Sequence, residues 1–109
     1  MPVQLRWNEP YGVIATLSGE YAVEDVADAF EDAFPKGSAV GPLIILDLCD
    51  SAQDHAPPEI EHLADVLSQR TDTVWVRTAD VLRYGLAREL MGCCAGRGVT
   101  VRIEHEDPG

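Results

Sequence analysis

A carboxylate, a hydroxyl and an imidazole stand within six positions of one another in the middle of this 109-residue chain. Asp50 and Ser51 are adjacent, and His55 follows the serine by four residues. A serine near a base is the minimum for nucleophilic catalysis, and an accessible serine is also a common site of phosphorylation. No G-x-S-x-G sequence surrounds Ser51, so the pattern does not indicate a hydrolase. The plainer interpretation is a turn in which Asp50 and Ser51 bind nearby backbone amides.

A second group, Glu59-Ile60-Glu61-His62, contains one Glu-x-x-His pair, which places a carboxylate and an imidazole on one face of a helix. Carboxylate-bridged metal pairs in helix bundles need two such motifs and further glutamates, and this chain has one. We therefore interpret these residues as a solvated acidic helix face, and we expect no metal site and no cofactor.

A third group, Arg77-Thr78-Ala79-Asp80, joins the end of a predicted strand to the start of a predicted helix. Helix N-termini attract anions, and the arginine would add positive charge there. The alternative is that the threonine or the aspartate caps the helix, with Arg83 and Arg88 in surface ion pairs.

The elements that position these groups follow from the spacing of apolar residues. Alternating or continuous apolar runs predict strands, and apolar residues three or four apart predict helices. Turn residues at 8–12 separate the first two strands, and Pro35-Lys36-Gly37 ends the first helix. The predicted elements are strands over 3–7 and 13–17, a helix over 22–34, a strand over 43–48, a helix from Pro57, a strand over 73–77, a helix over 81–95 and a strand over 99–103.

Each predicted helix has an apolar stripe that we expect to face a core. The stripes are Val23, Val26, Ala27, Phe30 and Phe34 in the first helix, Ile60, Leu63, Ala64 and Leu67 in the second, and Leu82, Leu86, Leu90, Met91 and Cys94 in the third.

The run Leu43-Ile44-Ile45-Leu46 is continuous, so its strand is expected to be buried on both faces, as parallel strands covered by helices are. Strand–helix–strand units cross over right-handedly, so the last three strands should run parallel. The sequence therefore predicts an α/β fold: a mixed five-stranded sheet, with an N-terminal antiparallel hairpin followed by parallel strands, and three helices. Asp47 to His55 would lie at the carboxyl end of a central strand, where open α/β sheets bind ligands.

The net charge of −11 lies in the first part of the chain. Residues 1–65 hold 13 acidic and two basic residues, whereas residues 66–109 hold six of each. Nucleic acids and anionic membranes are bound through Lys and Arg, so the charge argues against both as partners. The acids either keep the domain soluble or steer a partner to the first helix.

Length and cysteine content fit one cytoplasmic domain over residues 1–109. The N-terminus does not have the basic and then apolar pattern of a signal peptide, and no apolar run approaches the roughly 20 residues of a membrane helix. Cys49, Cys93 and Cys94 are too few for a disulfide framework, and the adjacent pair is expected to face the core.

The order of the predicted elements, with "LIILDLCDSA" in the middle and "VWVRTADVLRYGLARELM" after it, resembles the STAS domain family and within it the SpoIIAA-like branch. The resemblance covers nearly the whole chain and implies a non-enzymatic docking module. Some STAS domains are switched by phosphorylation of a serine, and others bind small ligands. The family's serine lies at the start of the helix after the central strand, where this chain reads "DHAPPEIEHL". The nearest serine is Ser51, and we predict that it is not a phosphorylation site.

The sequence thus predicts a small non-catalytic binding or regulatory module for a protein partner, with a second copy of the chain or a small molecule as further candidates. The first alternative is a carrier of an apolar, lipid-like ligand, because SpoIIAA-like domains look similar to part of the CRAL-TRIO fold. It would need an apolar pocket near Phe30 and Phe34. The second alternative is an enzyme, for which the sequence shows no set of base, nucleophile and oxyanion donor. The candidate binding residues are Asp50, Ser51, His55, Arg77 and Thr78.

Overall fold

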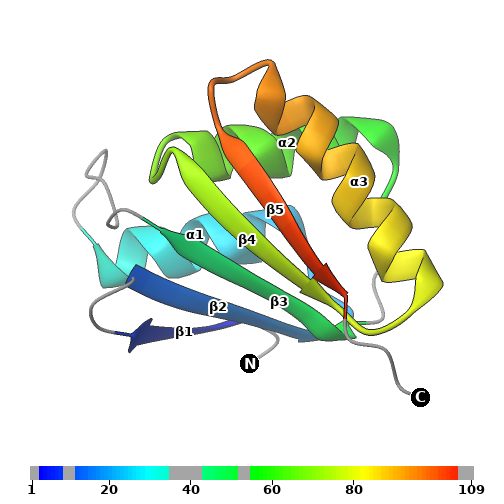
Figure 1. Ribbon diagram of the computed structural model, residues 1–109. Helices are drawn as coiled ribbons and strands as arrows, with labels where there is room; N and C mark the ends of the chain where they lie inside the picture. Colours follow the sequence, from blue (N-terminus) through cyan, green and yellow to red (C-terminus); the bar gives the residue numbers. More distant parts are fainter. Residues whose placement is uncertain (1–2, 9–11, 35–42, 52–54, 106–109) are drawn as a thin grey trace.

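The chain alternates strands and helices in the order that its apolar pattern predicts (Figure 1). The computed structural model describes residues 3–8, 12–34, 43–51 and 55–105. All eight predicted elements are present, and the predicted α/β fold with a mixed five-stranded sheet is confirmed. The elements are β1 (Val3–Asn8), β2 (Gly12–Gly19), α1 (Val23–Ala33), β3 (Ile44–Ser51), α2 (Pro57–Ser68), β4 (Thr73–Thr78), α3 (Val81–Ala95) and β5 (Thr100–His105).

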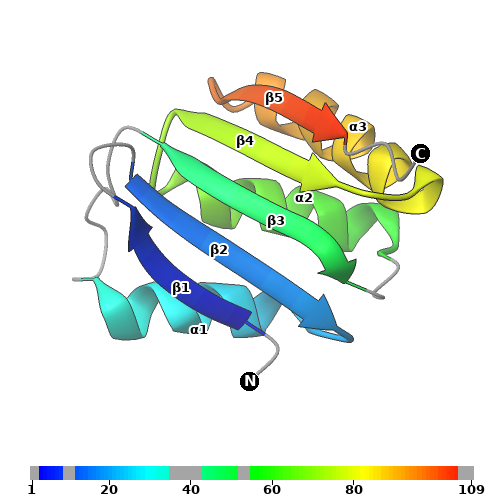
Figure 2. The ribbon, with the colours of Figure 1, turned by 60° about the horizontal axis from the view of Figure 1, so that its bottom comes forward.

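All three helices cover the same face of the sheet. The strand order is β1-β2-β3-β4-β5, with β1 antiparallel to β2 and the other neighbours parallel. Each strand–helix–strand crossover therefore steps in the same direction, and right-handed crossovers that step one way place their helices on one face. The views in Figures 1 and 2 agree that α1, α2 and α3 lie on one side of the sheet.

This topology changes where a ligand site can form. Doubly wound sheets bind ligands in the crevice where the strand order reverses. The described strands show no such reversal. A site at the carboxyl edge of this sheet must therefore be built from the loops and helix starts that lie there.

One hydrophobic core fills the space between the sheet and the helices. Alternate residues of β2, β3 and β4 meet the apolar stripes of all three helices, and Phe30 of α1 is fully buried among them. The predicted stripes of the first two helices are confirmed. Their buried members are Val23, Val26, Phe30, Ile60, Leu63, Ala64 and Leu67.

The first turn of α3 differs from the prediction. Leu82, expected in the core, is 69% exposed, and Arg83, expected in a surface ion pair, is 6% exposed. Successive helical residues are about 100° apart, so position 83 lies about 20° from Leu90 around the helix axis, whereas position 82 lies about 80° away. The later members of the predicted stripe are buried or half-buried: Leu86, Leu90, Met91 and Cys94.

Strand β3 runs three residues beyond its predicted end, to Ser51. Asp47, predicted at the carboxyl edge, lies within the strand and is paired in register with Arg77 of β4. The register against β2 then shifts by one residue, so that Ser18 pairs with Asp50. A β-bulge of this kind exchanges the faces to which the following residues point. Consequently Ser51 is 7% exposed, whereas Asp50 is exposed to solvent.

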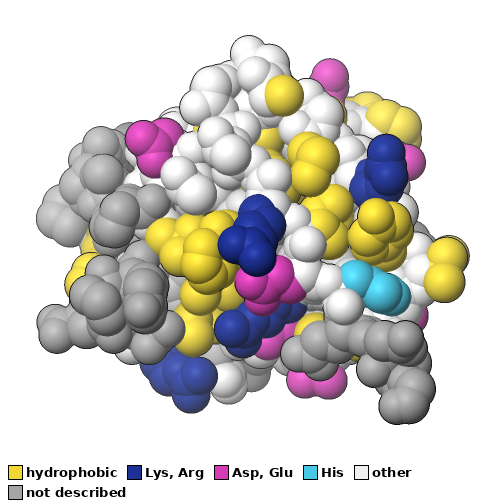
Figure 3. Space-filling view, viewed as in Figure 1, with side chains coloured by type: hydrophobic (Ala, Val, Ile, Leu, Met, Phe, Trp, Pro, Cys, Tyr) yellow, Lys and Arg dark blue, Asp and Glu magenta, His cyan; other side chains and the backbone are white. Residues whose placement is uncertain are grey.

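The opposite face of the sheet carries no helix from the described part of the chain (Figure 2). Ile45 is nevertheless only 4% exposed, because it packs with Ile14, Leu43 and the half-buried Trp75 in a small second cluster. Burial of β3 on both faces is thus confirmed, although helices cover only one of them. Charged side chains adjoin the apolar ones on this face (Figure 3), where the Arg102 guanidinium lies 5.3 Å from the Trp75 ring centre.

Several predictions concern residues outside the described ranges. These are most of the turn at 8–12, the helix end at Pro35-Lys36-Gly37, residues 52–54 of the segment after β3, and the end of the chain from 106. Within the described ranges, no helix combines the length and the apolar character needed to cross a membrane.

Candidate functional site

Tyr21 and His55 form the centre of a buried polar group near the carboxyl ends of β2 and β3. Tyr21 stands between β2 and α1, and His55 stands just before α2. The Tyr21 hydroxyl lies 2.6 Å from His55 Nε2, and the two rings meet edge to face with their centres 5.0 Å apart. The imidazole has no exposed surface. This contact joins the start of α1 to the start of α2 across 34 residues of sequence.

Glu59, in the first turn of α2, orients the His55 ring. One carboxylate oxygen lies 3.4 Å from His55 Nδ1, and the other accepts a hydrogen bond of 3.1 Å from the Ala56 backbone N–H. An ionised carboxylate can only accept, so in the neutral imidazole Nδ1 carries the proton and Nε2 accepts from the Tyr21 hydroxyl. The bond from Ala56, and after it the bond from His55, lowers the pKa of Glu59. Tyr21, His55 and Glu59 therefore form one directed chain of hydrogen bonds.

Ser51 and Arg83 complete the surroundings of the Tyr21 hydroxyl. Burial raises the pKa of Tyr21 to about 12, and a hydrogen bond with the Ser51 side chain and the nearby charge of Arg83 oppose this rise only in part. Tyr21 is therefore neutral at pH 7 and keeps a hydroxyl proton to donate. Ser51 thus has a phenol beside it, and both nitrogens of His55 are engaged elsewhere. His55 is therefore not oriented as a base toward Ser51.

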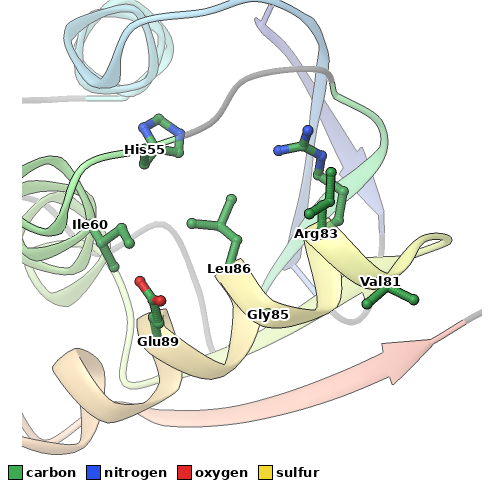
Figure 4. Close-up of a pocket in the computed structure, with 8 residues that line it drawn as sticks. His55, Ile60, Val81, Arg83, Gly85, Leu86 and Glu89 are labelled. Carbon is green, nitrogen blue, oxygen red and sulfur yellow. The ribbon is translucent and has the colours of Figure 1, made fainter.

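Helix α3 brings Arg83 into this group from its first turn. Asp80 is the N-cap, and its carboxylate accepts a hydrogen bond of 2.8 Å from the Arg83 backbone N–H. The predicted cap is therefore confirmed for Asp80. Figure 4 shows Leu86 between the Arg83 guanidinium and the His55 ring. All three side chains lie on the same side of α3 in this view.

A cleft of about 360 Å³ opens between the starts of α2 and α3. Two apolar side chains at its edge project into solvent, Val81 at 80% exposed and Leu82 at 69%. Glu89 lies at the other end of the cleft, beside Ile60 (Figure 4). The cleft is lined by His55, Ile60, Val81, Leu82, Arg83, Gly85, Leu86 and Glu89.

The structure brings together only part of the predicted binding set. Ser51 and His55 both contact Tyr21, as expected of neighbouring site residues. Asp50 is turned away to solvent by the bulge. Arg77 and Thr78, at the end of β4, make their contacts with β5 and not with this group.

Arg77 and Thr78 both contact β5. Arg77 Nε lies 3.7 Å from the Glu104 carboxylate. Arg77 lies two residues after Trp75 in β4, so both side chains point to the helix-free face. Thr78 is fully buried, and its hydroxyl lies 2.8 Å from His105 Nδ1. Neither residue lines the cleft.

The Glu-x-x-His pair does not act as a unit. Glu59 is directed to His55, whereas His62 is exposed, with its Nδ1 4.0 Å from the Glu24 carboxylate of α1. Among the described residues, no three His, Cys, Asp or Glu side chains are placed to share a metal ion. Cys94 is buried in the core as predicted, and burial raises the pKa of its thiol to about 11, which keeps it protonated.

Sequence reasoning missed Tyr21, Arg83 and the exposed pair Val81-Leu82. Tyr21 lies between β2, which ends at Gly19, and α1, which begins at Val23, so it belongs to neither apolar pattern. Arg83 lies seven residues before Leu90, and that spacing, applied to the core face of α3, would have placed it inward. The same spacing would have placed Leu82 at the surface.

A scan against protein-family models, a search of curated proteins and a search of solved structures each found no match to this chain.

Proposed function

We propose that this chain is a non-catalytic docking module that binds a protein partner at the cleft between the starts of α2 and α3. The observation that carries the proposal is the exposure of Val81 and Leu82 at the edge of that cleft. Apolar side chains of this size are normally buried, and adjacent exposed ones beside a hollow are typical of binding surfaces.

The polar group beneath the cleft supports a binding role. Tyr21, His55 and Glu59 use their hydrogen bonds on one another and on the backbone, so they fix the walls of the cleft. A pre-formed surface lowers the entropic cost of binding. The resemblance to STAS domains agrees with a docking role, and the acidic surface agrees with a partner that is not a nucleic acid. A cytoplasmic location belongs to the same proposal.

The alternative of an apolar-ligand carrier has less support. That role requires an apolar pocket under α1, whereas Phe30 is fully buried in the core and Phe34 packs against it. Neither phenylalanine lines the cleft.

Site-specific photo-crosslinking tests the proposal. A photoreactive amino acid replaces Leu82 in the full chain within its native cells, and the same substitution at exposed Ala33 of α1 is the matched control. We expect one protein to crosslink from position 82 and not from position 33. Once that protein is purified, Leu82→Asp should weaken its binding at least about tenfold while the melting temperature is retained, because Leu82 is exposed. No specific crosslink from position 82, or equal binding by Leu82→Asp, would contradict the proposal.

A further inference from the structure

The cleft continues into a groove between α2 and α3. A second hollow of about 610 Å³ lies between these helices and shares Ile60 and Glu89 with the cleft. We call the surface that the two hollows line along α3, from Gly85 to Gly96, the α2–α3 groove. The second hollow is lined by Pro57, Ile60, Glu61, Glu89, Gly92, Cys93, Gly96 and Arg97.

No contact among the described residues explains two glycines of α3, Gly85 and Gly92. Neither Gly85 nor Gly92 has a positive φ, and a Cβ added to either would meet no atom within 4 Å. Glycine is the least favourable helix residue after proline, so alanine would suit both positions better. Both glycines line the groove, and their seven-residue spacing places them on the same side of α3. Their small size therefore allows something outside the domain to approach the α3 backbone closely.

The exposed, unpaired charges on the walls of the groove are carboxylates, although two arginines also line it. Glu61 of α2 and Glu89 of α3 line it, and neither has an ion-pair partner among the described residues. Arg83 lines the cleft, but it is 6% exposed and its charge lies near Tyr21. Arg97 lines the second hollow near Glu61, but it is bound by the Asp65 carboxylate and donates to the Cys93 carbonyl oxygen at 2.9 Å. A partner that brings positive charge would therefore be favoured here.

We propose that the α2–α3 groove binds a basic amphipathic helix of the partner protein, which deepens the proposed docking function and rests on it. The groove-facing side of that helix carries small and apolar residues, and its flanks carry Lys or Arg to meet Glu61 and Glu89. The eleven-residue distance from Gly85 to Gly96 corresponds to about 16 Å, or three turns of such a helix.

A helix fits this groove better than an extended segment or a second copy of the chain. The groove walls are helices whose backbone groups are already hydrogen-bonded, so an extended segment would find no strand edge to pair with. A second copy would bring its own acidic surface, since the chain carries a net charge of −11.

Selection from a random peptide library tests this inference without a known partner. Phage-displayed peptides of roughly 15 residues, long enough for four helical turns, are selected on the full-length chain. The enriched peptides are then synthesised, and their binding is measured by calorimetry to the wild type, Gly92→Leu, Ala95→Leu and Leu82→Asp. Ala95 is the matched control, because it is an exposed small residue of the same helix that does not line the groove. Thermal melting checks that each variant is folded.

We expect the enriched peptides to be basic and to become helical on binding, as seen by circular dichroism. Gly92→Leu should weaken their binding at least about tenfold, and Ala95→Leu should change it less than about twofold. Acidic or uncharged peptides, peptides that stay extended, equal binding to Gly92→Leu, or no enrichment would each overturn the inference. The inference would also be overturned if the chain associates with itself and Gly92→Leu abolishes this association, because a second copy would then occupy the groove. If Leu82→Asp loses binding and Gly92→Leu does not, the proposed docking at the cleft stands and only the proposed helix in the groove is contradicted.

Discussion

At the scale of single residues, the buried Tyr21 hydroxyl organises the carboxyl edge of the sheet. It donates to His55, which Glu59 orients, and it lies beside Ser51 and the charge of Arg83. Sequence analysis singled out Ser51 and His55 for their chemistry, but both contact a tyrosine that lies 34 residues before His55 in the sequence. No local pattern encodes a contact of that range.

Tyr21→Phe should lower the free energy of unfolding by about 1–3 kcal/mol at pH 7, because His55 Nε2 is left buried without its donor. The variant should also lose a pH dependence. The pKa of Tyr21 is raised from 10 to about 12 in the folded protein, so its contribution is fully present below pH 10 and is lost as the pH rises from 10 to 12. Over that range the wild type should lose up to roughly 2–3 kcal/mol more stability than Tyr21→Phe.

Urea unfolding between pH 7 and pH 11.5 measures both effects. Tyr84→Phe, the same change at an exposed tyrosine, is the control. If Tyr21→Phe loses stability with rising pH as steeply as the wild type does, the buried phenol is not the group responsible.

Ser51 is predicted to be structural and not a phosphorylation site. It is 7% exposed and engaged with Tyr21, so a kinase cannot reach its hydroxyl in the folded protein. Ser51→Asp should cost about 1–3 kcal/mol through burial of a carboxylate, part of which Arg83 offsets, and Ser51→Ala should cost less. Chemical denaturation measures both variants, and mass spectrometry of the protein from its native cells measures the modification. Stoichiometric phosphate on Ser51 would show that this segment opens and would restore a phosphorylation switch.

At the scale of elements, apolar spacing was sufficient to predict the order and type of every helix and strand, because each buries one face or both. It could not predict the bulge in β3, which depends on the register against β2 and decides that Ser51 and not Asp50 faces inward. It also misplaced the first turn of α3, where Leu82 was favoured for the core because leucine is apolar. Helix geometry gives that position to Arg83, whose charged end reaches the polar group at the sheet edge. Of the predicted binding residues, the structure therefore groups Ser51 and His55 around Tyr21, whereas Asp50 is exposed and Arg77 and Thr78 contact β5.

Gly92→Ala should stabilise the protein by about 1 kcal/mol, because it improves the helix propensity of α3 and the added methyl group meets no other atom. The melting temperature should rise by roughly 4–8 °C. Gly98→Ala is the control and should be destabilising, because Gly98 has a φ of +75° that alanine adopts poorly. Calorimetric melting measures both variants. A lower melting temperature for Gly92→Ala would show that α3 needs this glycine for its own packing, and the argument for a close partner would lose its basis.

At the scale of the whole molecule, the central strand β3 is buried on both faces although helices cover only one face of the sheet. Ile45 lies on the helix-free face and is 4% exposed. Ile45→Asp should abolish folding, because a carboxylate without a cation would be buried at a cost of several kcal/mol. Ile45→Val, which keeps the apolar contact, should cost about 0.5–1.5 kcal/mol. Circular dichroism and thermal melting distinguish these outcomes, and a cooperatively melting Ile45→Asp protein would place β3 at the surface.

The distribution of charge over the molecule predicts how a partner approaches. Helix α1, whose acids are exposed, lies beside α2, where Glu24 approaches His62, and Glu61 of α2 lines the groove. Raising the ionic strength from 0.01 M to 0.15 M shortens the screening length from about 30 Å to about 8 Å. The association rate of the partner captured at position 82 should therefore fall several-fold over this range, while its dissociation rate changes little.

Stopped-flow kinetics with the wild type and with the triple variant Asp28→Asn/Glu31→Gln/Asp32→Asn measure the effect. The triple variant should associate more slowly, and its association rate should depend less on salt. Association rates that do not change with salt in either protein would mean that the acids of α1 serve solubility alone.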